Sequence, residues 1–232
     1  MSYAGRHVVV TGGTGALGTA LVGALLEAGA HCHVPFIDPG ADAHFEHAQH
    51  KSVSLHPGVD LADETQVVKL YAALPALWAS IHLAGGFAAA KIADTAKADL
   101  MQQIDMNLVS AFLCSREAVK TMTRGGGGRI VNVAARPALE PRHGAGMTAY
   151  TASKAGVAAL TAALAEEVVA QNILVNAVAP SVMDTPANRQ AMPKADHAKW
   201  PKVEEVAATI LFLASPENRV TRGAVVPVYG KS

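Results

Sequence analysis

Short apolar runs rich in β-branched residues alternate with longer amphipathic segments along the 232 residues of this chain. Several short runs are apolar at successive positions, as in Val8-Val9-Val10, which indicates a strand buried on both faces and therefore a parallel sheet. Strands that alternate with helices predict an α/β fold of the Rossmann type, with one doubly wound parallel sheet and helices on both faces. In such a sheet the ligand site lies at the carboxyl ends of the strands.

About seven strands and five main helices are expected. No internal repeat or Pro/Ser-rich linker divides the chain, so residues 1–232 are expected to form a single domain. The expected strands cover residues 7–11, 31–37, 53–55, 79–84, 129–134, 174–179 and 224–228. The expected helices cover residues 16–28, 63–74, 99–124, 148–170 and 203–214.

The composition excludes several classes of protein. Half of the residues are hydrophobic, 16% are charged and the net charge is zero, which is typical of a globular chain and not of a disordered or nucleic-acid-binding one. No apolar run approaches the roughly 18 residues of a membrane span. Cys32 and Cys114 lie in apolar runs and no signal peptide is evident, so we expect free thiols and a cytoplasmic location.

A glycine-rich turn follows the first expected strand and opens the first expected helix. The sequence TGGTGALG, residues 11–18, allows the backbone to turn tightly and to approach a pyrophosphate, which the helix N-terminus then binds. Because the pattern lies after a strand and before a helix, it indicates dinucleotide binding far more specifically than the glycines alone would. The residues expected to bind a dinucleotide here are Gly12, Gly13, Gly15, Ala16, Leu17 and Gly18.

Asp38 stands about 20 residues beyond the last of these glycines, where an acidic side chain binds the adenosine ribose. No Lys or Arg occurs between Gly18 and Lys51, so nothing there would favour a 2′-phosphate. The sequence therefore favours NAD(H) as cofactor, with NADP(H) as the alternative. A solvated turn residue is the other interpretation of Asp38.

Two further loops at the carboxyl ends of strands are candidates for cofactor contacts. Asp60 and Leu61 follow the third expected strand, and Ala84, Gly85 and Gly86 follow the fourth. Small residues at such a position let adenosine and ribose lie against the backbone. A tight turn between strand and helix explains the same residues without a ligand.

Tyr150 and Lys154 are one helical turn apart and therefore lie on one face of the expected helix 148–170. A tyrosine with its ordinary pKa near 10 is a poor acid–base group at neutral pH. We expect the lysine ammonium to lower that pKa and also to bind a nicotinamide ribose. The cofactor would then supply the hydride, and Tyr150 would supply the proton as general acid.

Together these motifs resemble those of the short-chain dehydrogenases/reductases, over essentially the whole chain. TGGTGALG, Asp60-Leu61, LAGG, Asn107, Tyr150-x-x-x-Lys154 and NAVAPSVMDTP follow the order and spacing of that family. The resemblance implies that Asn107 holds a proton-relay water and that Pro180 borders the cofactor. It also implies a homodimer or homotetramer formed through the long helices.

Within the family the likeness is closest to the dihydropteridine reductases. LAGGFA, the pair Ala134-Ala135 in place of a serine, Ser181 after Pro180, and the segment 184–200 carry it. Asn107 and its surroundings instead resemble more typical members. The expected reaction is therefore hydride transfer from NAD(P)H to a small planar C=N or C=O substrate.

Ala135 occupies the position where the family places a serine that polarises the substrate carbonyl. A methyl group donates no hydrogen bond, and loss of one such donor costs roughly 2.7–4 kcal/mol by analogy with an oxyanion hole. Three accounts are open. The substrate develops little oxyanion character, or Thr148 or Ser153 replaces the donor, or the chain is a nucleotide-sensing protein with little catalysis. A generic carbonyl or 3-oxoacyl reductase is the alternative within enzymes.

Other polar residues are weaker candidates. His143 precedes Tyr150, while Asn188 and Arg189 lie in the loop that covers the substrate in this fold, so these three are expected on the substrate side with Ala135. The ten histidines include His44-x-x-His47-x-x-His50, but no second cluster completes a tetrahedral set, so no metal is expected. The expected partners are a small-molecule substrate and other copies of the chain, with no nucleic acid and no membrane.

Overall fold

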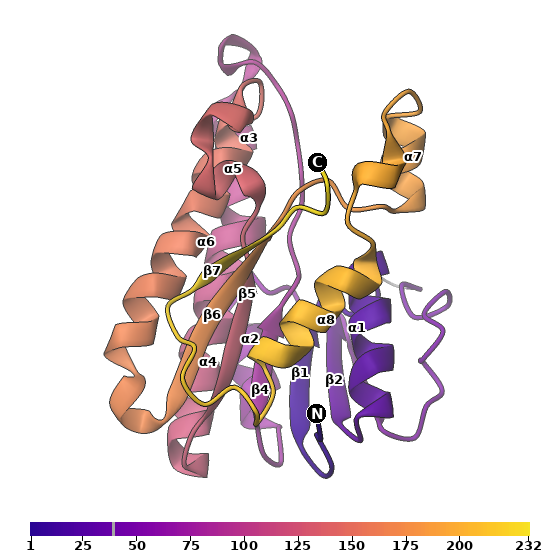
Figure 1. The fold of residues 1–232 in the computed structure, drawn as a ribbon. Coiled ribbons are helices and arrows are strands. Elements are labelled where there is room, and N and C mark those ends of the chain that lie inside the picture. Colours follow the sequence, from indigo (N-terminus) through magenta and orange to yellow (C-terminus); the bar gives the residue numbers. More distant parts are fainter. Residues whose placement is uncertain (39) are drawn as a thin grey trace.

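Seven parallel strands form one sheet in the computed structural model, which describes residues 1–38 and 40–232 (Figure 1). The strand order is β3-β2-β1-β4-β5-β6-β7, so the winding direction reverses between β1 and β4. That reversal places a crevice at the carboxyl ends of these two strands. The strands are β1 (His7–Thr11), β2 (His31–Phe36), β3 (Val53–Pro57), β4 (Ala79–His82), β5 (Gly128–Val133), β6 (Ile173–Pro180) and β7 (Val225–Val228).

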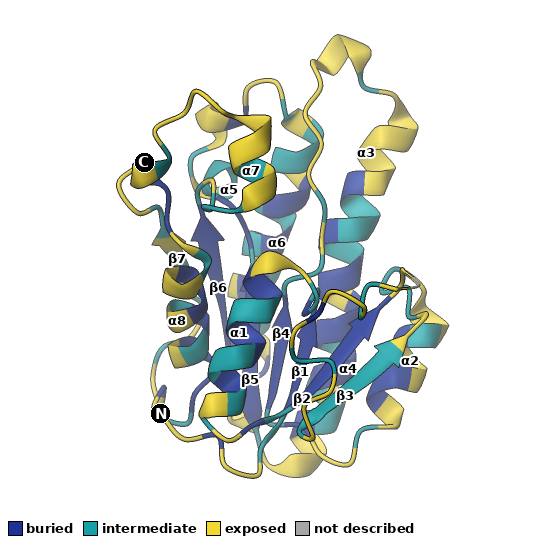
Figure 2. Cartoon of the chain, turned by 90° about the vertical axis from the view of Figure 1, so that its right-hand side faces the viewer, coloured by how far each residue is buried: buried dark blue, intermediate teal, exposed yellow. Residues whose placement is uncertain are grey.

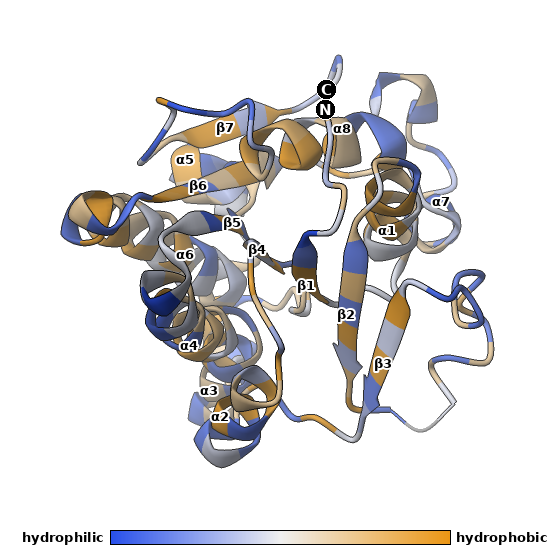
Figure 3. Ribbon diagram, turned by 90° about the horizontal axis from the view of Figure 1, so that it is seen from below, coloured by the Kyte–Doolittle hydropathy of each residue, from blue (hydrophilic) through white to orange (hydrophobic). Residues whose placement is uncertain are grey.

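Helices cover both faces of the sheet. Helices α1 and α8 pack together on one face, and α2, α4 and α6 lie on the other (Figures 1 and 3). Short helices α3, α5 and α7 lie at the carboxyl end of the sheet (Figure 1). Their bounds are α1 (Ala16–Glu27), α2 (Glu64–Ala72), α3 (Lys97–Ile104), α4 (Ser110–Gly125), α5 (Arg136–Leu139), α6 (Thr148–Glu167), α7 (Pro186–Ala191) and α8 (Val203–Leu213).

The core consists of two apolar clusters separated by the sheet. Val8 and Val10 belong to the cluster under α1 and α8, whereas Val9 belongs to the cluster under α2, α4 and α6. Burial of successive residues on opposite faces is what the run Val8-Val9-Val10 predicted. The inner strands are buried at nearly every position, while β3 at the sheet edge is mostly half-buried (Figure 2).

The predicted fold class is confirmed, and all seven strands occur within a few residues of their expected bounds. The helix expected over 99–124 is present as α3 and α4, which a π-helical turn over Asp105–Val109 joins without a break. The side-chain pattern did not indicate the π turn, because one extra residue in a turn changes backbone hydrogen bonding more than hydrophobic spacing.

A chain of buried polar groups links α2, β4, β5 and α6. Tyr71 Oη lies 2.7 Å from Ser80 Oγ, which lies 2.8 Å from His82 Nε2. On the other side of the ring, His82 Nδ1 lies 2.7 Å from Asn132 Oδ1, and Asn132 Nδ2 donates to Thr161. Because the amide oxygen can only accept, His82 donates from Nδ1 and accepts at Nε2, which is the neutral imidazole.

Burial lowers the pKa of His82 to about 4, although the Asn132 hydrogen bond opposes the shift. The unfolded chain takes up a proton near pH 6.5 and the folded chain does not, so the free energy of unfolding falls as the pH drops from about 6.5 to about 4. From these two values we predict a loss of about 2 kcal/mol between pH 7 and pH 5 from His82 alone.

Urea denaturation of the wild type and of His82→Gln at both pH values measures this contribution. The variant should be less stable at pH 7 but should lose about 2 kcal/mol less on acidification. His143→Gln is the control substitution, because His143 is 53% exposed and lies outside this buried chain of polar groups. An equal slope in His82→Gln and wild type would contradict the assignment.

Candidate active site

The glycine-rich turn connects β1 to α1 at the point where the strand order reverses. Gly12 has φ of +64°, and a Cβ on it would lie 2.8 Å from the backbone nitrogen of Ala84 after β4. A Cβ on Gly18 would lie about 2.2 Å from the carbonyl oxygen of Gly12. Only glycine fits both positions, so α1 begins close against the turn and its N-terminus faces the crevice.

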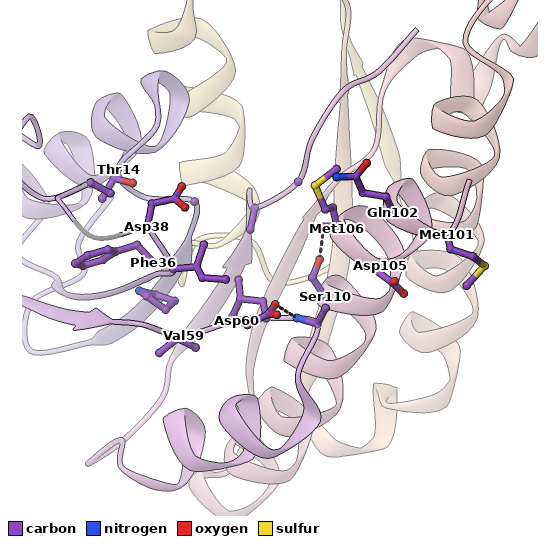
Figure 4. Close-up of a pocket in the computed structure, with 18 of the residues that line it drawn as sticks. Thr14, Phe36, Asp38, Val59, Asp60, Met101, Gln102, Asp105, Met106 and Ser110 are labelled. Carbon is purple, nitrogen blue, oxygen red and sulfur yellow. Dashed lines mark hydrogen bonds between the residues drawn. The ribbon is translucent and has the colours of Figure 1, made fainter. Parts of the chain in front are cut away.

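A cavity of about 820 Å³ opens beside this turn, between the ends of β2 and β3 and the helices α3 and α4 (Figure 4). Asp38 and Thr14 lie on one wall, and Met101, Gln102 and Met106 lie on the opposite wall (Figure 4). The cavity also contacts the predicted cofactor residues Gly12, Asp60, Leu61, Ala84 and Gly85. Its described lining contains three aspartates and no Lys or Arg.

Asp60 has a structural task that the sequence did not indicate. Its Oδ1 accepts a hydrogen bond of 2.8 Å from the backbone of Ala62, and its own backbone N–H donates to Gln66 Oε1. These bonds hold the loop between β3 and α2 against the cavity.

Gly13 lies behind the glycine-rich turn, where a Cβ would lie 2.7 Å from the Val34 side chain. Gly13 lines neither the 820 Å³ cavity nor the smaller cavity beside Tyr150.

A second cavity, of about 330 Å³, joins the glycine-rich turn to the Tyr-x-x-x-Lys helix. Residues predicted from seven separate stretches of sequence line this cavity. They are Gly12, Gly15, Ala16, Leu17, Gly18, Gly85, Gly86, Asn107, Ala135, Tyr150, Lys154, Pro180 and Asn188.

Lys154 is buried, and its Nζ donates a hydrogen bond of 2.8 Å to the carbonyl oxygen of Val133 at the end of β5. Burial lowers the pKa of this lysine to about 8, and burial raises the pKa of Tyr150 to about 12. The expected lowering of the tyrosine pKa is therefore not seen in this structure. Desolvation of the phenol outweighs the effect of an ammonium that is directed at Val133.

Asn107 lies in the π-helical turn and is 1% exposed. Its Oδ1 accepts from the Gly86 backbone N–H at 3.1 Å, and its Nδ2 donates to the Gly86 carbonyl at 3.0 Å and to Ser153 Oγ at 3.2 Å. The side chain thereby ties the loop after β4 to α6. π-helical turns occur frequently at functional sites, which fits this position.

A third cavity, of about 410 Å³, lies on the far side of Tyr150 and has a largely apolar lining. Ala135 and Tyr150 border both this cavity and the smaller one, so the two cavities meet at these side chains. Met147, Met183 and Trp200 contribute to the apolar wall. A small ligand in this cavity would contact the phenol of Tyr150 on one side and the methyl group of Ala135 on another.

The other residues predicted on the substrate side have different positions. His143 and Asn188 line the 410 Å³ cavity, and His143 Nε2 lies 3.2 Å from Glu140 Oε2. Asn188 donates to the Met183 carbonyl at 2.8 Å. Arg189 instead forms a paired contact with Asp184, with nitrogen–oxygen distances of 2.5 and 2.7 Å, and it is absent from the described cavity lining.

Neither hydroxyl proposed to replace the serine lies on the described cavity lining. Ser153 is fully buried and donates to the Tyr150 carbonyl while it accepts from Asn107. Thr148 is exposed at the start of α6. The hydroxyl-bearing side chain that lines both cavities with Ala135 is Ser181, whose Oγ donates to the Tyr229 carbonyl at 3.0 Å.

The sequence interpretation missed Phe87 and Trp200 as cavity residues. The Phe87 ring meets the Tyr150 ring edge-on, with centroids 5.0 Å apart and planes at 81°. Phe87 directly follows Gly86 at the glycine-rich end of β4, and this position could have identified it as a cavity residue. Trp200 ends the segment 184–200, which the resemblance alone suggested as a substrate-side loop, and no pattern of residues singled it out.

No helix among the described residues is long and apolar enough to cross a membrane.

Known proteins resemble the chain along nearly its whole length. Cis-4-hydroxycyclohexanecarboxylate dehydrogenase of Sinomonas cyclohexanicum is 33% identical over 245 residues, covering 99% of this chain and 97% of the relative. The structure of a short-chain type dehydrogenase/reductase from Mycobacterium ulcerans superposes with a TM-score of 0.90 at 24% identity, covering 100% of this chain and 90% of that one.

A structure of ElxO with NADP bound also shares the fold, with a TM-score of 0.88 at 22% identity and 97% of each chain covered. Residues 6–196 match the short chain dehydrogenase family. The match includes the glycine-rich turn, Asn107, Tyr150 and Lys154, which the structure brings to one cavity. The chain therefore belongs to the short-chain dehydrogenase family.

Proposed function

We propose that the chain transfers a hydride from NAD(P)H to a small planar C=N or C=O substrate, with Tyr150 as general acid. The observation that carries the proposal is the 330 Å³ cavity, where Tyr150 and Lys154 share a wall with the glycine-rich turn. The N-terminus of α1 after the glycine-rich turn and the buried ammonium of Lys154 fit a dinucleotide, because they offer backbone N–H groups and a cation. Bound nicotinamide supplies the hydride.

Each catalytic residue has a distinct task in this proposal. Tyr150 is protonated at neutral pH and therefore carries the proton that the reduced substrate requires, although its pKa of about 12 makes it a weaker acid than a tyrosine with the ordinary pKa near 10. Lys154 has three N–H donors and uses one on Val133, which leaves two for the ribose hydroxyls. Asn107 binds both backbone groups of Gly86 and so fixes the loop after β4, which lines the cavity proposed for the nicotinamide. We propose that Asn107 also holds the proton-relay water.

Ala135 narrows the substrate class. The cavity beside Tyr150 presents a methyl group where the family places a serine, so a transition state with a localised oxyanion loses a donor there. A quinonoid C=N substrate of the dihydropterin type spreads that charge over its ring. We therefore propose a substrate of this type, as the sequence motifs alone suggested.

A second candidate is a generic carbonyl or 3-oxoacyl reductase. The relative from Sinomonas cyclohexanicum favours it, because its name gives a ring alcohol as substrate. The apolar cavity of about 410 Å³ suits a ring of that size as well as a pterin. A nucleotide-sensing role without turnover is the remaining alternative, and the experiments below separate all three.

We further propose a homodimer or homotetramer formed through the long helices. Phe112 on α4 is 49% exposed, and Leu100 and Met101 on α3 also reach the surface. Apolar helix faces of this kind gain stability when a second copy covers them.

The free, buried thiols of Cys32 and Cys114 support a cytoplasmic location.

Replacement of Tyr150 by Phe should reduce kcat by about 10²–10⁴, because the proton donor is lost. The dissociation constant for NADH should change little, since the cofactor is held by the glycine-rich turn and Lys154. The measurement is NADH and NADPH oxidation with quinonoid dihydropterin, a 3-oxoacyl thioester and a simple ketone. Turnover of the thioester alone would reject the pterin proposal, and tight cofactor binding without any turnover would reject catalysis.

Replacement of Ala135 by Ser should raise kcat/KM on the true substrate by no more than a few fold. The reason is that a substrate with delocalised charge gains little from an extra donor. The same variant should improve simple ketone reduction more strongly, up to the roughly 10²-fold effect of an oxyanion donor. A large gain on dihydropterin would show that the native site lacks a donor that its substrate needs.

Asp38 should determine the preference for NADH over NADPH. Its carboxylate lies on the wall of the 820 Å³ cavity. There it would repel a 2′-phosphate and accept hydrogen bonds from the ribose hydroxyl groups. Asp38→Asn should lower the ratio of kcat/KM for NADH to that for NADPH by about 10-fold or more. Asp105→Asn on the opposite wall is the matched control, and an equal change there would refute a specific role for Asp38.

A further inference from the structure

Four histidines gather on one sheet face, away from the proposed active site. His7 on β1 is in register with His31 on β2, and His33 on β2 is in register with Ser54 on β3. Neighbours in register on parallel strands point to the same face, and His56 lies two residues beyond Ser54 on that face. Figure 3 views this end of the sheet, where β1, β2 and β3 lie side by side.

The imidazoles are close enough to share one ion. Each of three rings contributes one nitrogen, and these three nitrogens lie within 4.8 Å of one another; the rings belong to His7, His31 and His33. The closest pair is His7 Nδ1 and His33 Nε2, 2.9 Å apart. Zinc binds imidazole at about 2.0–2.1 Å, which puts two ligand nitrogens of a tetrahedral site about 3.3 Å apart. Binding of zinc would therefore replace the His7–His33 hydrogen bond, separate these two nitrogens slightly and bring the more distant ligand nitrogens closer through side-chain rotation.

Outer contacts orient these rings as they do in known metal sites. His33 Nδ1 lies 3.2 Å from His56 Nε2, so a His33 bound through Nε2 donates its remaining proton to His56. His31 Nε2 lies 2.9 Å from Ser54 Oγ, which leaves Nδ1 of that ring for an ion.

We propose that His7, His31 and His33 bind a zinc ion, with His56 as the partner that orients His33. Three imidazoles leave the fourth tetrahedral position to water. His7 and His31 are half-buried, so the site is in contact with solvent.

The ion would act on stability and not on the reaction. His7 and His31 are the first residues of β1 and β2, whereas Gly12 and Asp38 follow the carboxyl ends of the same two strands. Zinc would join β1 to β2, and His33 would connect the site to His56 on the edge strand β3. The site therefore stands independently of the proposed substrate and cofactor.

Isothermal titration of the untagged full chain with zinc chloride, after removal of metal by EDTA and dialysis, tests the proposal. We expect one zinc per chain with micromolar or tighter affinity. At zinc 100 times above the dissociation constant, the Tm should rise by about 5–10 °C. No binding, or binding without a Tm shift, would overturn the proposal.

Variants identify the ligands. His7→Asn and His31→Asn replace half-buried residues and should each weaken zinc binding at least 100-fold, while His56→Asn should weaken it about 10–100-fold through loss of the outer contact. His44→Asn/His50→Asn is the matched control, since these exposed histidines lie on the segment before β3. Binding lost in that control but kept in His7→Asn would place the zinc elsewhere and refute the assignment.

Discussion

The contact between the glycine-rich turn and the end of β4 determines where everything else in the site can lie. Gly12 approaches the Ala84 backbone so closely that a Cβ would lie 2.8 Å from its nitrogen. This contact joins the two strands between which the winding reverses, so β1 with β2 and β3 lies on one side and β4 with β5 to β7 on the other. The adenosine-side cavity lies beside β2 and β3, and the catalytic residues lie beside β5 and α6.

The catalytic side is held by bonds between side chains and backbone. Lys154 is bound to the end of β5 through Val133, and Asn107 is bound to the loop after β4 through Gly86. Ser153 links Asn107 to the backbone of Tyr150. These bonds fix the lysine, the loop and the tyrosine relative to one another, which is the kind of support that a precise proton transfer needs.

The sequence predicted the fold and the cavity composition well because both depend on local signals. Alternating apolar patterns identified the strands, and the glycine spacing and Tyr-x-x-x-Lys each act within a single turn of chain. The π-helical turn at Asn107, the position of Trp200 and the histidine cluster were not predicted. They depend on backbone hydrogen bonding or on register between strands that are distant in sequence. The pKa of Tyr150 was misjudged because spacing gives proximity to Lys154 but not the extent of burial.

The central claim is that cofactor and substrate meet between Tyr150 and Ala135, and a crystal structure of the chain with NADH bound tests it most directly. The account predicts the pyrophosphate at the N-terminus of α1, the adenosine ribose at Asp38, and the nicotinamide ring beside Tyr150 with its ribose bound to Lys154. A cofactor whose nicotinamide lies outside the cavity that Tyr150 and Ala135 share would contradict the account.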